Sequence, residues 1–104
     1  MDTQLKRGLL DVCVLSVLSK GESYGYKIIS DLSSHILISE STLYPILKKL
    51  EQTGCVTTRK AEHNGRLRKY YIITAMGKER IKEYLTDMQE FLNVHEFIRQ
   101  GGSL

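Results

Sequence analysis

The sequence predicts a mainly helical α+β domain that contains one β-hairpin and ends in a long helix. Apolar residues recur at helical spacing through most of the 104-residue chain, and the spacing changes to every second residue only between residues 56 and 73. A favoured hairpin dipeptide, Asn64-Gly65, lies in the middle of that stretch. The single proline also favours a helix-rich fold. At this length we expect one domain, which excludes a large two-domain enzyme with a deep cleft between its domains.

The first predicted helix includes residues 9–18, which are apolar on nearly all sides and are interrupted only by Asp11 and Ser16. Such a helix should be covered on more than one side, so we expect it at the centre of the core. The two cysteines, Cys13 and Cys55, lie in apolar surroundings without a C-x-x-C spacing. Reduced core thiols are therefore expected, with neither a disulfide framework nor a zinc site.

A second helix is expected at about residues 24–33, with Ser23 as its cap. Gly25 is a poor helix former, which indicates close backbone packing at that position. After the helix, the short β-prone run at residues 35–38 predicts a single edge strand. The inward-facing side chains of the helix are expected to be Tyr26, Ile29 and either Leu32 or Ile28.

The third helix should begin near Ser39 or Ser41 and run to Thr53, because apolar residues recur at i, i+3, i+4 and i+7 and Gly54 provides a stop. These apolar residues are Leu43, Ile46, Leu47 and Leu50. The opposite face is polar, with hydroxyls first and cations later. It carries Ser41, Pro45, Lys48 and Gln52, with Thr42 and Lys49 on one flank and Tyr44 on the other.

Residues 56–62 and 67–73 are predicted to form a hairpin joined by a tight turn at Asn64-Gly65. A two-residue turn fixes the register, so Lys60 should lie directly opposite Lys69. Two opposed lysines repel each other, and an anion lying over the pair would account for them.

Thr74 should cap a final helix that runs to about Arg99, longer than a domain of this size needs, and residues 101–104 should form a disordered tail. Its apolar stripe is too wide for a lone surface helix, so we expect a second copy of the chain to cover it. The expected dimerisation residues are Ile81, Tyr84, Leu85, Met88, Phe91, Leu92, His95 and Ile98. Phe91, Val94, His95 and Ile98 are also candidates to line a pocket for a small effector.

The charges are segregated along the chain. Residues 48–69 carry seven cations and two acids, a net charge of +5, whereas the rest of the chain has a net charge of −2. The basic block spans the exposed side of the third helix and the hairpin, and predicts a surface for a polyanion. Between residues 79 and 96 the last helix has five acids and two cations, which disfavours nucleic acid and suits self-association.

The element order is that of a winged helix-turn-helix, in which the third helix enters the major groove of DNA and the hairpin is the wing. The run Ser41-Thr42-Leu43-Tyr44-Pro45-Ile46-Leu47-Lys48-Lys49-Leu50-Glu51 and the later Arg68-Lys69-Tyr70-Tyr71-Ile72-Ile73-Thr74 resemble the PadR family of bacterial transcriptional regulators. Tyr24-Gly25-Tyr26 also matches, and the length is similar to that of the small subfamily. The resemblance implies a homodimer, joined by its terminal helices, that acts on a palindromic operator, usually as a repressor, and is released by a small aromatic or hydrophobic effector.

We therefore expect a winged-helix DNA-binding domain at residues 1–74 and a dimerisation helix at residues 75–100. No arrangement of catalytic or metal-ligating residues is present in the sequence, so neither an enzyme nor a cofactor is expected. No signal or membrane-spanning segment is expected, which favours the cytoplasm. The alternatives are a winged-helix protein-interaction module and a thiol-based redox regulator that uses Cys13. The expected DNA-binding residues are Ser41, Thr42, Tyr44, Pro45, Lys48, Lys49, Lys60, His63, Asn64, Arg66, Arg68 and Lys69.

Overall fold

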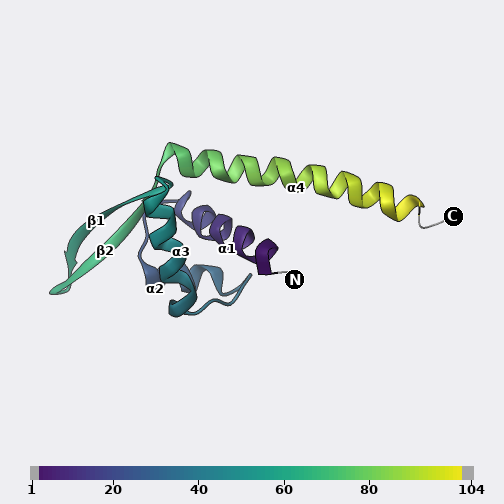
Figure 1. Ribbon diagram of the computed structural model, residues 1–104. Helices are drawn as coiled ribbons and strands as arrows, with labels where there is room; N and C mark the ends of the chain where they lie inside the picture. The colour runs from purple at the N-terminus through teal and green to yellow at the C-terminus, as the bar shows by residue number, and fades with distance from the viewer. Residues whose placement is uncertain (1–2, 102–104) are drawn as a thin grey trace.

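The computed structural model describes residues 3–101, with side chains from residue 8 onward. The elements are α1 (Thr3–Leu18), α2 (Gly25–Leu32), α3 (Glu40–Gln52), β1 (Val56–His63), β2 (Arg66–Ile73) and α4 (Ala75–Gly101). Figure 1 shows α1, α2 and α3 gathered together, with the β1–β2 hairpin and the end of α4 extending from them in opposite directions. The predicted fold class, a helical domain with a small antiparallel sheet and a long terminal helix, is confirmed.

Helix α1 is the centre of the core, as its apolar character predicts. It packs against α2, α3, β2 and α4. Val14, Leu15 and Leu18 of α1 are almost completely buried. The other buried residues of this core come from α2, α3, the hairpin and the segment between α3 and β1, and they are Ile28, Leu32, Leu43, Leu47, Leu50, Cys55, Val56 and Tyr71.

The predicted start and inner face of α2 were partly wrong. Tyr26 is 73% exposed, whereas Ile28 and Leu32 are buried, because two residues of helix turn Tyr26 about 200° away from Ile28. Ser23 is not the cap: Tyr24 holds that position without a side-chain hydrogen bond. The backbone of Ser23 instead pairs with Tyr71 of β2, with N···O distances of 3.1 and 2.7 Å. This single residue pair lies on the edge of β2 that β1 does not cover.

The predicted edge strand at residues 35–38 was also wrong. His35 and Ile36 donate backbone hydrogen bonds to the Leu32 carbonyl, at 2.9 and 2.8 Å, and so form the turn that ends α2. Ile36 and Ile38 are half-buried and pack on the core. Their β-branched side chains therefore pack on the core from an irregular segment. The backbone pairing with the hairpin is made by Ser23 instead.

The hairpin register was predicted correctly. Val56 pairs with Ile73 and Lys60 pairs with Lys69. Asn64 and Gly65 have φ angles of 52° and 78°, the left-handed conformation that a type I′ turn requires at both positions. The turn chemistry of these two residues thus fixes which side chains of the hairpin lie opposite one another.

The beginning of α4 is held by Thr74, as expected. Its hydroxyl accepts a hydrogen bond from the Gly77 N–H at 3.1 Å and donates one to the Gly54 carbonyl at 2.6 Å. The helix continues through Gly101, two residues beyond its predicted end near Arg99 and into the tail expected at residues 101–104. Residues 1–2 of the expected first unit and residues 102–104 of the expected tail lie outside the described part of the chain.

Candidate nucleic-acid interface

The N-terminus of α3 presents a group of exposed hydroxyls. Ser39 is the N-cap, and its Oγ accepts a hydrogen bond from the backbone N–H of Thr42 at 3.3 Å. The same Oγ lies 2.9 Å from Ser41 Oγ and 3.2 Å from Thr42 Oγ1. Because the first N–H groups of a helix carry partial positive charge, these hydroxyls suit phosphate oxygens or the acceptors of base edges.

Tyr44 is positioned by α2. A Cβ atom at Gly25 would lie 2.4 Å from the Tyr44 hydroxyl oxygen and 2.9 Å from Cζ, so only glycine allows the ring to pack there. This is the close approach that Gly25 predicted. Tyr44 remains 45% exposed, which leaves part of the ring at the surface beside Thr42 and Pro45.

The two lysines in the middle of α3 have different environments. Lys48 is exposed on the polar face of the helix. The Nζ atom of Lys49 instead lies 2.8 Å from the carboxylate of Asp11 on α1, a residue that is only 2% exposed.

The polar face of α3 gives little support to the alternative of a protein-interaction module, which would need a contiguous apolar surface there.

On the side of the hairpin that faces α3, Glu51 contacts one residue of each strand. Its carboxylate lies 3.6 Å from Lys69 Nζ and accepts a hydrogen bond from the Thr58 hydroxyl at 3.2 Å. Lys69 also lies over the ring of the buried Tyr71, 5.4 Å from its centroid. Glu51 therefore offsets part of the repulsion between Lys60 and Lys69, so the pair does not by itself require an external anion.

On the opposite side of the hairpin, charged and aromatic groups attach it to the loop before α2. Arg59 forms an ion pair with Glu22, and the guanidinium hydrogen bonds lower the pKa of that carboxyl. Arg68 lies 3.9 Å from the centroid of the Tyr24 ring, which makes an edge contact with Tyr70. Arg68 is thus half-buried against Tyr24 although it lies only two residue pairs from the tip of the wing, where His63, Asn64 and Arg66 are exposed.

These contacts include residues that the sequence analysis did not select, chiefly Asp11, Glu22, Tyr24 and Arg59. A lone acid in an apolar helix was a detectable signal for Asp11, because a buried carboxylate needs a partner. The partners themselves are far away in the sequence and have no local pattern. The structure brings the selected α3 and hairpin residues onto adjoining surfaces, and their contacts with DNA remain predictions.

Helix α4 leaves much of its apolar side uncovered. The exposed fractions are 60% for Leu85, 57% for Phe91, 49% for Leu92, 64% for Ile98 and 77% for Phe97. Among the other predicted dimerisation residues, Ile81, Tyr84 and Met88 are half-buried and His95 is exposed. The uncovered residues lie mainly on the part of α4 that extends past the helical core (Figure 1).

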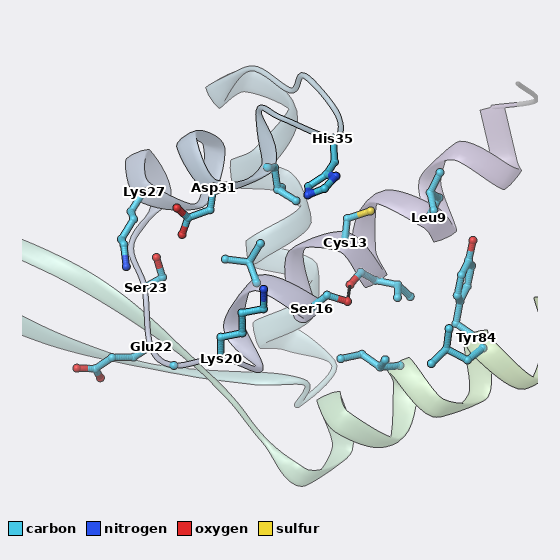
Figure 2. Close-up of a pocket in the computed structure, with 16 residues that line it drawn as sticks. Leu9, Cys13, Ser16, Lys20, Glu22, Ser23, Lys27, Asp31, His35 and Tyr84 are labelled. Atoms are coloured by element: carbon cyan, nitrogen blue, oxygen red, sulfur yellow. Dashed lines mark hydrogen bonds between the residues drawn. The ribbon is translucent and has the colours of Figure 1, made fainter.

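A pocket of about 810 Å³ lies between α1, α2 and the beginning of α4. Figure 2 shows Leu9 and Cys13 of α1 bordering it, with Tyr84 of α4 nearby and Lys27 and Asp31 at its α2 end. The candidate effector residues Phe91, Val94, His95 and Ile98 do not line this pocket; they lie farther along α4, and their role remains a prediction. Figure 2 also includes the hydrogen bond from the Ser16 hydroxyl to the Val12 carbonyl, at 2.8 Å.

Cys13 was expected to be fully buried. It is half-buried, because it faces this pocket. Burial raises the pKa of the Cys13 thiol, which lowers the fraction of the reactive thiolate. This environment disfavours the redox-regulator alternative. Cys55 is buried in the core.

Two features are absent from residues 3–101. Within that range, no helix has both the length and the apolar character required to cross a bilayer. The described part of the chain also has no group of three or more His, Cys, Asp or Glu side chains that could hold a metal ion.

Comparison with solved structures reveals several relatives. A crystal structure from Streptococcus mutans UA159 is 38% identical, covers 91% of this chain and 90% of its own, and superposes with a TM-score of 0.78. A PadR-like transcription factor from Bacteroides fragilis is 28% identical, covers 92% of this chain and 95% of its own, and has a TM-score of 0.82. Bacillus subtilis PadR, solved in complex with operator DNA, is 32% identical with a TM-score of 0.69, over 74% of this chain and 46% of that one.

The curated Bacillus subtilis protein, a negative transcriptional regulator, is 34% identical over 82 residues, and the chain spans about half of its length. Residues 14–83 match the sequence model of the family described as "Transcriptional regulator PadR-like family". Members of this family are transcriptional regulators and not enzymes. The chain therefore belongs to the PadR-like family of transcriptional regulators.

Proposed function

We propose that this regulator binds a roughly palindromic DNA operator as a homodimer in the cytoplasm. Residues 1–74 act as the DNA-binding unit, with α3 in the major groove and the hairpin against the flanking DNA. The observation that carries this proposal is the continuity of the basic surface. Residues 48–69 have a net charge of +5, and Lys48, Lys60, Arg66 and Lys69 are all exposed along α3 and the hairpin.

The residues divide by chemistry into two groups. The hydroxyls at the start of α3 and the exposed part of Tyr44 read base edges, because they can donate and accept hydrogen bonds. The cations contact phosphates and supply most of the affinity that does not depend on sequence. Lys48, Lys60, Arg66 and Lys69 are in the second group, with His63 and Asn64 beside them at the tip of the wing.

The regulator acts as a repressor in this proposal. Support comes from Bacillus subtilis PadR, a negative transcriptional regulator whose structure includes operator DNA. The similarity covers 74% of this chain. A protein that occupies an operator blocks transcription without needing any further activity, so repression requires only the DNA-binding surface and a dimer.

The dimer is formed by residues 75–100. Helix α4 has 27 residues and is about 40 Å long at 1.5 Å per residue. Leu85 belongs both to the exposed apolar side of α4 and to the lining of the pocket beside α1. A second α4 lying along this side would cover the exposed residues and the pocket in one contact, which is the isologous arrangement of a two-fold dimer.

A small aromatic or hydrophobic effector would bind where the two α4 helices meet α1. The apolar lining of the 810 Å³ pocket supports this, since small-molecule sites of this kind have volumes of about 300–1,000 Å³. Phe91, Val94, His95 and Ile98 would reach such an effector from the partner subunit if the helices run antiparallel.

The DNA-binding proposal is tested with Lys48→Ala. A duplex is first selected from a randomised library with the wild-type protein, and fluorescence anisotropy then gives affinities for this duplex and a scrambled one across a salt series. Loss of one phosphate contact should reduce the slope of log K against log salt by about 0.9 per protomer on both duplexes.

The matched control is Lys82→Ala, which removes the same charge from an exposed position on α4. Its slope should equal that of the wild type. If Lys48→Ala and Lys82→Ala behave alike, the exposed face of α3 does not lie against DNA and the proposed orientation is wrong.

A further inference from the structure

Asp11 is a charged residue in α1, the helix at the centre of the core. It is 2% exposed, and its neighbours in the sequence, Leu10 and Val12, are buried as well. A carboxylate in such a place is tolerated only when cations or hydrogen-bond donors compensate for the water that it has lost. The groups that provide this compensation come from two different helices.

The first is Lys49 of α3, whose Nζ atom donates a hydrogen bond to Asp11 Oδ2 at 2.8 Å. The second is Arg80 of α4, with Nη2 at 3.6 Å from the same oxygen. Both cations are themselves partly exposed, with side-chain exposures of 54% and 36%. A single carboxylate oxygen of α1 therefore connects the proposed recognition helix with the first turns of the proposed dimerisation helix.

The packing makes this connection direct. Helix α1 lies against both α3 and α4. Arg80 is one residue before Ile81, which packs on the core and lines the pocket between α1 and α4. A movement of α4 along α1 therefore changes the distance from Arg80 to Asp11. Because Asp11 is buried, a weaker contact with Arg80 must be compensated by the only other cation paired with it among the described residues, Lys49.

We propose that Asp11 is a positioning residue that couples the placement of α4 to the recognition helix and to the availability of Lys49 for DNA. This inference rests on the proposed function. While Asp11 holds Lys49, the α3 cation that faces phosphate is Lys48. When the hold on Lys49 is released, an additional cation becomes available that strengthens binding to every sequence, and discrimination between sequences falls.

The test is Asp11→Asn, measured on the selected and scrambled duplexes across a salt series. The ratio of the two affinities should fall by at least about fivefold, the lower end of typical coupling between sites. On scrambled DNA the salt slope should become steeper by about 0.9 per protomer, because Lys49 is free to contact phosphate. A residue with only a structural role would weaken binding without steepening the slope.

Glu79→Gln is the matched control, because it makes the same change in charge at an exposed position next to Arg80. It should leave the affinity ratio and the salt slope as in the wild type. If folded, dimeric Asp11→Asn also leaves both quantities unchanged, the proposal is overturned. If the wild-type protein selects no duplex at all, the proposed function fails, which is a different result.

Arg80→Met tests the contribution of α4 separately. It also tests the proposal if Asp11→Asn does not fold, because Arg80 is partly exposed and the variant keeps the ion pair between Lys49 and Asp11. Without Arg80, Lys49 is the one remaining cation paired with Asp11 among the described residues and is held more tightly, so we expect the affinity ratio to rise by at least about fivefold and Arg80→Lys to restore most of the wild-type ratio. Lys82→Met is the control for lost charge on the same helix. Unchanged selectivity in Arg80→Met overturns the coupling of α4 to α3.

Discussion

Replacing Leu85 and Leu92 by aspartate should dissociate the proposed dimer. The two leucines are seven residues apart on one side of α4 and are 60% and 49% exposed in the single chain. Complete burial of a leucine side chain contributes about 1.5–3 kcal/mol, so the area still to be covered is worth about 2–3 kcal/mol per protomer. In a two-fold interface this loss is counted twice. The total of about 4–6 kcal/mol raises the dimer dissociation constant by roughly three to four powers of ten.

The burial of the new carboxylates would add to this cost. Analytical ultracentrifugation at micromolar concentration should therefore find a monomer for the double variant and a dimer for the wild type. The matched control places aspartates at Thr86 and Asn93, with the same spacing and charge but on the polar side of α4, and should remain dimeric. A double leucine variant that still sediments as a dimer would show that the subunits meet elsewhere.

Two other predictions concern the frame that supports these surfaces. Gly77→Ala should lower the free energy of unfolding by about 1–2 kcal/mol despite a better helix propensity, because its Cβ would lie 2.3 Å from the Cys55 carbonyl oxygen and 2.7 Å from Ile73 Cγ1; an unchanged midpoint of thermal unfolding would contradict this. Arg59→Met should return the lowered pKa of Glu22 to its ordinary value in an NMR titration. A carboxyl whose pKa is lower in the folded state stabilises the fold at pH values above its unfolded-state pKa, and this stabilisation is lost as the pH falls. The variant lacks this contribution and should therefore lose less stability on acidification. An unchanged Glu22 pKa would show that the ion pair is absent in solution.

The parts of the fold that depend on local chemistry could be predicted from the sequence. The apolar spacing in α3 and the turn at Asn64-Gly65 each act within a few residues, and the hairpin register follows from the turn. The sequence left the start of α3 open between Ser39 and Ser41, and the structure has Ser39 as the cap. The pairing of Ser23 with Tyr71 could not be predicted in this way. A bridge of one residue pair has no periodicity, and nothing near Ser23 indicates which strand edge lies beside it.

The candidate site shows the same division. Exposed positions on α3 and the hairpin follow from helix and strand geometry, so the selected residues fall on adjoining surfaces. The difference between Lys48 and Lys49 does not follow from it, because Asp11 is 38 residues away from Lys49 in the sequence. The attachment of Arg68 to Tyr24 likewise depends on the packing of the loop before α2 against the hairpin.

Recognition of DNA by a dimer through α3 and the wing is best examined by salt-dependent anisotropy of the wild-type protein. Selection should enrich a palindromic duplex, and two chains should bind it. Binding to this duplex should be much tighter than binding to scrambled DNA, with log K falling steeply as log salt rises. Equal, weak and salt-insensitive binding to both duplexes would show that the basic surface has another partner.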